Sequence, residues 1–191
     1  MVKKYYLLIV FGTVCVSLFA QQKKAGYTFH SINNLSLVNG NNAVSGSLQS
    51  VNGFKKGSWY AGAGVGIDYY LYRTVPLFAD LRYAFGKKKN NFFAYADAGI
   101  NFNWVQDQFI DNPSNWNGNT SSTFQNGMYT DVGLGYSFQT KNKNALVLSL
   151  GHSVKSLKEL EKYRDWRTQE LLTKINSYNL NRIMIKVGWQ F

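Results

Sequence analysis

Few side chains in this sequence have the types and spacing that catalysis requires. Its two histidines are His30 and His152, and Ser153 directly follows the second of them. A serine hydroxyl becomes a nucleophile when a neighbouring base accepts its hydrogen bond. Successive side chains on a β-strand point to opposite faces, so His152 cannot activate Ser153 if this segment is a strand. We therefore predict no catalytic residue, and we do not expect an enzyme.

Metal and cofactor chemistry has no supporting pattern either. The one cysteine, Cys15, lies near the N-terminus, and the two histidines do not cluster with other ligand types. Gly62, Gly64 and Gly66 alternate along a strand-like segment, whereas the glycines of a phosphate-binding loop open a helix. The sequence therefore predicts no metal, cofactor or nucleotide site.

A group of charged residues shares one face of segments that alternate between apolar and polar positions. These residues are Asp68, Asp80, Asp97, Asp131, Arg82, Lys155, Arg182 and Lys186. If this face lines a narrow interior, charges of both signs must pair there, since a buried unpaired charge is strongly destabilising. The mixture predicts an ion-paired plug more than an open channel.

The acidic members of this group need more than one cation. We expect Asp68, Asp80 and Asp97 to lie opposite or diagonal to one another on three adjacent strands. Three carboxylates that shared only Arg82 would repel one another, so a second cation must reach them. The candidates are Arg182 and Lys186.

The segments that position these charges have the period-two pattern of β-strands. In the last ten residues, every second side chain from Ile183 to Phe191 is apolar. Five further segments alternate clearly: 59–72, 75–85, 92–104, 128–138 and 145–157. Two weaker segments, about 29–38 and 44–51, complete an even number. The pattern predicts an all-β fold, an eight-stranded antiparallel up-and-down barrel.

The distribution of residue types over the two faces indicates a membrane barrel. The apolar face of the clear strands carries no Asp, Glu, Lys or Arg, and its aromatic residues gather near strand ends. Such aromatic girdles are typical of barrels that cross a bilayer. A secreted soluble barrel of lipocalin type is the alternative, but its exterior would carry the charges.

The lengths of the connections give the barrel an orientation. With both termini in the periplasm, the connections there should be short. These short turns are predicted at 52–56, 86–90 and 140–144. The long connections, 105–127 and 158–177, are expected to face outside, and the links near Gly40 and Arg73 are short. Residues 157–175 have apolar residues at spacings that fit a short amphipathic helix, but we favour a hairpin that extends strands seven and eight.

The positive charge of the chain is concentrated in the predicted turns. The formal net charge is +11, and the turn lysines are Lys55, Lys56, Lys87, Lys88, Lys89, Lys141 and Lys143. They can contact anionic lipid head groups or an anionic periplasmic or envelope protein partner, or they serve only solubility. Nucleic acid is not an expected partner, because the chain carries an export signal.

The N-terminus has the pattern of a secretory signal peptide. Lys3 and Lys4 precede an apolar run, 5–19, and Ala20 ends it. Lipidation of Cys15 is disfavoured, because Val14 precedes it where such signals have a small residue. We expect residues 1–20 to be the signal peptide and residues 21–191 to form one barrel domain without cysteine.

The mature segment, 21–191, resembles the small outer-membrane β-barrel proteins of OmpA/OmpX-like architecture. The segments 31–34, 59–70 and 75–78 are similar to uncharacterised barrels of Bacteroidetes-type bacteria. The strand that ends at Phe191 resembles the C-terminal strand that the barrel assembly machinery of Gram-negative bacteria recognises. The resemblance implies an outer-membrane location and contact with outer-membrane lipids, and it implies no activity.

Two functions are compatible with these features. The first is a non-enzymatic barrel with a plugged lumen that acts as a structural, scaffolding or surface-binding protein. The second is an outer-membrane enzyme that modifies the acyl chains of lipid A through an unrecognised site. We favour the first, because neither histidine has a partner placed for catalysis.

Overall fold

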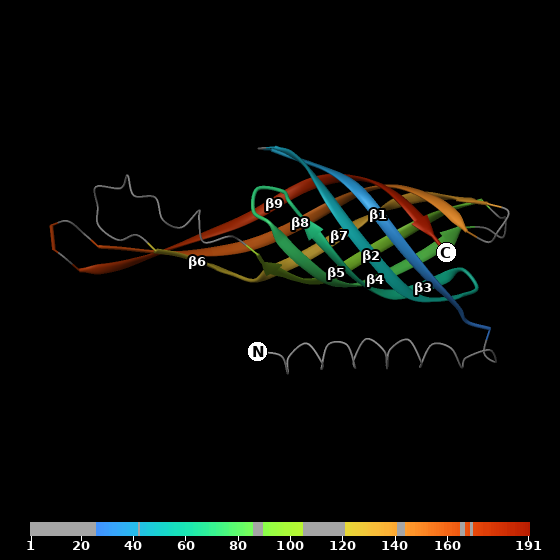
Figure 1. The fold of residues 1–191 in the computed structure, drawn as a ribbon, viewed down its shortest axis with the longest axis horizontal. Coiled ribbons are helices and arrows are strands. Elements are labelled where there is room, and N and C mark those ends of the chain that lie inside the picture. Colours follow the sequence, from blue (N-terminus) through green and yellow to red (C-terminus); the bar gives the residue numbers. More distant parts are fainter. Residues whose placement is uncertain are drawn as a thin grey trace, which may run out of the picture.

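Nine antiparallel β-strands account for most of the computed structural model, which describes residues 26–41, 43–85, 90–104, 121–140, 144–164, 167–168 and 170–191 (Figure 1). The strands are β1 (Thr28–Gly40), β2 (Val44–Lys56), β3 (Trp59–Asp68), β4 (Thr74–Phe85), β5 (Asn91–Asn103), β6 (Ser121–Gln125), β7 (Gly127–Gln139), β8 (Ala145–Arg164) and β9 (Leu171–Gln190). Within these ranges, no helix is long and apolar enough to cross a membrane. The expected signal peptide, residues 1–20, lies outside the described residues.

The sheet closes on itself into a ring. Neighbouring strands follow the order β1, β2, β3, β4, β5, β7, β8, β9, and β9 pairs again with β1. At this seam Ser31 and Phe191 exchange two backbone hydrogen bonds of 3.0 Å. Closure leaves the ring without an unpaired edge, which is what a sheet in hydrocarbon requires.

The strand count differs from the expected eight because β6 lies beyond the ring. Both β6 and β7 pair with β8: Gln125 lies opposite Lys158, and Tyr129 lies opposite Lys155. Asn126 separates β6 from β7, so β6 continues the line of β7 along the outer half of β8. Part of the predicted loop 105–127 is therefore a strand, and residues 105–120 lie outside the described residues.

The prediction of a turn at 52–56 is wrong. Strand β2 runs through this segment and ends at Lys56, and the turn consists of Gly57 and Ser58. Gly57 has a φ of 61°, a left-handed conformation that glycine adopts without steric cost. The Asn52-Gly53 pair is a common turn signal. Here Gly53 instead allows close approach, because a Cβ there would collide with the backbone of β3.

The connection between β3 and β4 also differs from the prediction. Strand β3 ends at Asp68 rather than at residue 72, and residues 69–73 form the connection. The Asp68 carboxylate accepts a 2.8 Å hydrogen bond from the backbone N–H of Tyr70, and Leu71 has a φ of 57°. The longer connection sets the register, so that Gly62 lies opposite Asp80.

Strands β8 and β9 extend far beyond the ring as a ribbon, and β6 pairs with the β8 side of it (Figure 1). Each strand has 20 residues, and their pairing continues to Arg164 opposite Leu171. This confirms the predicted hairpin and excludes a helix over the paired residues. The predicted loop 158–177 is correspondingly shorter, because only residues 165–170 lie between the two strands.

The remaining predicted turns are only partly described. Residues 86–89 and 141–143, and with them five of the turn lysines, lie outside the described residues. Thr140 and Asn144 flank residues 141–143, and the N–H of Thr140 donates a 2.7 Å hydrogen bond to the carbonyl of Asn144. We call the end of the barrel with these connections and Phe191 the turn end, and the opposite end with the ribbon the loop end.

The barrel is apolar outside and polar inside. On β9, Ile183 and Ile185 are 54% and 55% exposed, whereas Arg182 and Met184 are at most 1% exposed. Aromatic side chains pack on each other across the outer surface near the turn end, such as Trp59 on Tyr83 with ring centroids 4.8 Å apart. This inversion of the usual soluble pattern is the one that a lipid-facing barrel requires.

Candidate functional site: the charged lumen

The lumen holds the group of charges that the sequence pattern placed on one face. All eight side chains are buried: Asp68, Asp80, Asp97, Asp131, Arg82, Lys155, Arg182 and Lys186. The four carboxylates balance the four cations. A balanced set can be buried in a narrow barrel because each charge finds an opposite charge within the wall.

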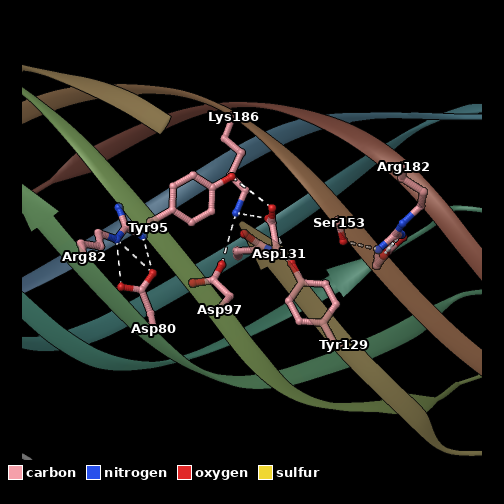
Figure 2. Close-up of polar contacts among 11 residues, drawn as sticks. Asp80, Arg82, Tyr95, Asp97, Tyr129, Asp131, Ser153, Arg182 and Lys186 are labelled. Carbon is pink, nitrogen blue, oxygen red and sulfur yellow. Dashed lines mark hydrogen bonds and ion pairs between the residues drawn. The ribbon is translucent and has the colours of Figure 1, made fainter. Parts of the chain in front are cut away.

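Three of the carboxylates form a row across adjacent strands. Asp80 on β4 lies directly opposite Asp97 on β5, and Asp97 lies directly opposite Asp131 on β7. Like charges at directly opposite positions repel one another. The row therefore depends on the cations at its two sides, Arg82 and Lys186 (Figure 2).

Arg82 and Lys186 neutralise this row from different directions. Arg82 donates to Asp80 through Nε at 2.9 and 3.0 Å and through Nη2 at 2.8 Å. The Nζ of Lys186 lies 2.6 Å from Asp131 and 3.4 Å from Asp97, so one ammonium bridges two strands. Strand β8 lies between β7 and β9 and carries Gly151 near this level. Because glycine has no side chain, Lys186 on β9 can reach past β8 to Asp131 on β7.

Tyrosine hydroxyls complete the contacts of Asp131. Tyr95 donates to its Oδ1 at 3.1 Å, and Tyr129 lies 3.5 Å from its Oδ2. The Tyr129 hydroxyl in turn accepts a 2.7 Å hydrogen bond from Gln49. The ring of Tyr95 also lies 4.6 Å from the Nζ of Lys186, close enough for a cation–π interaction. These contacts fix the lysine between the carboxylates and the ring.

A second cluster surrounds Asp68 nearer to the loop end. Arg182 forms an ion pair and a hydrogen bond with the Asp68 carboxylate, and its Nη2 donates to Ser153 at 2.8 Å. The Nζ of Lys155 lies 3.6 Å from Asp68 and donates to the backbone carbonyls of Tyr70 and Tyr72 at 3.0 and 2.8 Å. One carboxylate and two backbone carbonyls thus hold two cations.

Glycines on the inner face make room for the large rings. A Cβ at Gly151 would collide with the Tyr95 hydroxyl, and one at Gly64 would collide with the ring of Phe78. Phe78 packs on Tyr129 with ring centroids 5.2 Å apart. The lumen is thus filled by side chains at the level of the charges, as expected for a ring of this strand number.

A further aromatic group lies at the loop end. Tyr72 packs on Phe124 of β6 and on Tyr178 of β9, with centroid distances of 4.9 and 5.8 Å. The Tyr178 hydroxyl donates a 2.8 Å hydrogen bond to Glu159 in the ribbon, and this bond raises the pKa of Tyr178. Leu157, which lies opposite Tyr178 on β8, is buried. The short strand β6 therefore contributes a ring to the aromatic packing at this end.

The predicted pairing is confirmed in part. Arg182 and Lys186 do reach lumen carboxylates, as the pattern predicts. The expectation that Asp68 lies opposite or diagonal to Asp80 is wrong, because Asp68 lies opposite Thr74 in the observed register. Sequence reasoning assigned no partner to Asp131 or Lys155, although it placed both on the inner face. Their partners depend on turn lengths, which the alternation pattern does not specify.

The two histidines lie on different strands, His30 on β1 and His152 on β8, and they face opposite sides of the barrel wall. His152 faces outward on β8, and Ser153 beside it is fully buried, as strand alternation predicts. His30 lies at the turn end, where its Nδ1 is 3.1 Å from Nε2 of Gln190. Within the described part of the chain, no three His, Cys, Asp or Glu side chains form a group that could hold a metal ion.

Solved structures with a similar fold exist, although no family model and no curated protein matches the chain. Neisserial surface protein A (NspA) matches with a TM-score of 0.54 and 11% identity, over 87% of this chain and 96% of that one. The outer membrane protein AlkL matches with a TM-score of 0.55 and 10% identity, over 88% and 92% of the two chains. The outer membrane protein OprG from Pseudomonas aeruginosa matches with a TM-score of 0.52 and 11% identity, over 88% and 97%.

These similarities, together with the closed ring and the apolar exterior, define the class of protein. The chain has the fold of the small outer-membrane β-barrel proteins. At identities this low the likeness concerns the fold alone.

Proposed function

We propose that the protein is an integral outer-membrane barrel that is neither a channel nor an enzyme, and that acts as a structural, scaffolding or surface-binding protein. The observation that carries this proposal is the level of the lumen that side chains fill, where each buried carboxylate among the described residues takes part in an ion pair. A stable aqueous path would have to break these pairs and displace the rings between them, at a cost of several kcal/mol for each unpaired charge.

The outer surface supports the membrane location. Its exposed apolar side chains suit contact with outer-membrane lipids, and its aromatic residues near the turn end suit the interfacial region. The last strand carries a continuous outward apolar face up to Phe191, which is 53% exposed. We propose that the barrel assembly machinery recognises this strand. We also propose that residues 1–20 act as the signal peptide that directs export of the chain.

The ribbon supports a binding role. Leu171–Asn181 of β9 pair only with β8 among the described strands, since β1 pairs with β9 from Arg182 onward. Leu171 and Ile175 on this segment are 61% and 64% exposed. A strand edge with exposed apolar side chains is a template on which another chain can add a strand.

Conductance measurements test the plugged lumen. We expect the purified protein to give no stable conductance steps in planar lipid bilayers. A double variant, Phe78→Ala with Tyr129→Ala, removes two rings that pack in the lumen and serves as the positive control for detection. Stable steps from the wild-type protein would overturn the proposal that the barrel is not a channel.

A deletion strain tests the absence of enzymatic activity. We expect mass spectrometry of lipid A to give the same acyl pattern with and without the protein. A changed pattern that is restored by the wild-type gene would favour the lipid-modifying enzyme instead.

The binding role is tested by shortening the ribbon. Lys158 and Ser177 lie opposite each other beyond the ring, so a short turn that joins them removes Leu171 and Ile175 and leaves the strand pairs of the ring in place. If the ribbon binds a partner, cross-links that the wild-type barrel forms in intact envelopes should be lost from this variant while its heat-modifiable band persists. Cross-links that persist unchanged would contradict a role for the ribbon.

A further inference from the structure

A cavity of about 480 Å³ occupies the turn end of the lumen. Every strand of the ring contributes to its lining, and its floor includes the apolar side chains of Ile32, Phe93 and Val147. Cavities that hold small organic molecules have volumes of about 300–1,000 Å³ and combine an apolar lining with a few convergent polar groups. The turn-end cavity has the size and the mixed lining of such a site.

The charged side chains that line this cavity are all basic. Lys55 and Arg82 contribute them, His30 adds an imidazole, and no Asp or Glu side chain belongs to the described lining. This distinguishes the cavity from the deeper lumen, where carboxylates and cations balance. Lys55 faces inward at the mouth, whereas its neighbour Lys56 is exposed and contacts the Tyr27 hydroxyl at 3.2 Å.

Arg82 is held rigidly at the inner end of the cavity. Its hydrogen bonds to Asp80 use Nε and Nη2, and within the described part of the chain Nη1 makes none. The guanidinium carbon lies 5.6 to 5.9 Å from the ring centroids of Tyr60, Phe93 and Tyr95. A guanidinium fixed in this way can present its remaining N–H groups to an anion with little loss of side-chain entropy.

We propose that the turn-end cavity binds a small organic anion, in which one carboxylate or phosphate group is attached to a short apolar or aromatic part. The anionic group would contact Arg82 and Lys55, and the apolar part would pack on Phe93 and its apolar neighbours. Inorganic phosphate alone would leave most of the volume unfilled. A lipid head group reaches the cavity less readily, because the barrel wall separates the lumen from the acyl chains.

The two histidines provide a site-specific assay. His30 lines the cavity, whereas His152 faces outward on β8. The full-length barrel with ¹⁵N-labelled histidine, in phosphatidylcholine nanodiscs, is titrated with phenyl phosphate. We expect a saturable shift of the His30 signals and none of the His152 signals. Shifts of both residues, or a shift of neither, would overturn the proposal.

Further probes separate the sources of the anion. Phenol carries the ring without the charge and should leave His30 unchanged at the concentrations that saturate phenyl phosphate. Nanodiscs with added phosphatidylglycerol, and without phenyl phosphate, present an anionic lipid head group instead of a soluble anion. If this lipid shifts His30 and phenyl phosphate does not, the cavity is a lipid site and the proposal fails.

A matched pair of variants tests the residues. Lys55→Gln removes a charge from the cavity lining, and Lys56→Gln removes the neighbouring charge on the outside. We expect Lys55→Gln to weaken the binding of phenyl phosphate about fivefold, as for the loss of one partly exposed ion pair. Lys56→Gln should leave it unchanged. Equal effects of both variants would show that only the overall charge of the rim matters, which would contradict a defined site.

Discussion

At the scale of single residues, Lys186 is the side chain on which most of the acidic row depends. Its ammonium lies within ion-pair distance of Asp97 and Asp131, whereas the ion pair of Arg82 among the described residues is with Asp80. Without Lys186, two buried carboxylates would face each other across β5 and β7 with no cation between them. The pairing of these two carboxylates therefore depends on the single side chain of Lys186.

Lys186→Ala should destabilise the folded barrel by about 3–5 kcal/mol, because it leaves buried charge unpaired. Arg182→Ala should act in the same direction, since Asp68 loses one of its two cations. Lys56→Ala, on the outer surface, should cost less than about 1 kcal/mol. Thermal unfolding followed by the loss of the heat-modifiable band measures all three. Equal midpoints would show that the lumen charges do not stabilise the barrel.

A double variant isolates the pair itself. Lys186→Met with Asp131→Asn removes one cation and one carboxylate together, so the lumen stays balanced. We expect it to unfold at a higher temperature than the single variant Lys186→Met, because replacing both charges of a buried pair is far less costly than removing one. A double variant that is less stable than the single one would exclude this account.

Gly151 offers a steric test of the same region. Gly151→Ala should destabilise the barrel by about 1–3 kcal/mol, because the new methyl group would collide with the Tyr95 hydroxyl. In a Tyr95→Phe background the additional cost of Gly151→Ala should be smaller. Gly46→Ala is the control, since a Cβ there meets no atom within 4 Å. A cost that is independent of Tyr95 would contradict the proposed contact.

At the scale of elements, the terminal strand joins the two ends of the chain. Deleting Phe191 removes the two backbone hydrogen bonds to Ser31 and the last residue of the outward apolar face. We expect this deletion to lower the fraction of heat-modifiable, SDS-resistant protein in cells. Replacing Phe191 by Tyr keeps an aromatic ring and both backbone bonds, and should preserve folding. Normal folding of the deletion variant would exclude the terminal aromatic as the recognition element.

Sequence alone predicts the strands well and their connections poorly. Period-two alternation is a local property, so β4, β5 and β7 begin and end within a residue of the predicted segments. Turns depend on what the flanking strands pair with. The Asn52-Gly53 pair has turn chemistry, yet β2 continues through it because β1 and β3 pair with both sides. Tertiary pairing therefore overrides the local signal.

The charged site illustrates the same limit. The inward side of Asp68 and Lys155 follows from alternation, but their contact depends on how far each connection shifts the register. A five-residue connection after β3 moves Asp68 away from Asp80 and toward Arg182. The set of buried charges was predictable, and the partners of each were not.

At the scale of the whole molecule, the two ends of the barrel differ in structure. Short connections join the strands at one end, and the ribbon with β6 extends from the other. In an outer membrane the turn end is expected to face the periplasm, since short turns lie on that side of such barrels.

Protease added to intact cells tests this orientation. We expect trypsin to cut, if anywhere, within 158–177, because 105–127 contains no Lys or Arg, and to spare the lysines of the turn end. Permeabilised cells are the control, because the turn lysines become accessible there. Cleavage at Lys87 to Lys89 in intact cells would show that the barrel has the opposite orientation.

The unbroken length of β8 and β9 has a mechanical consequence. A 20-residue strand spans on the order of 65 Å at about 3.3 Å per residue, whereas about 10 residues suffice to cross a bilayer. A force that pulls on the ribbon along its axis is transmitted through continuous backbone to the far rim of the ring. It loads the inter-strand hydrogen bonds of both strands in parallel shear instead of opening them one after another. The ribbon is thus a stiff arm anchored along the whole height of the wall.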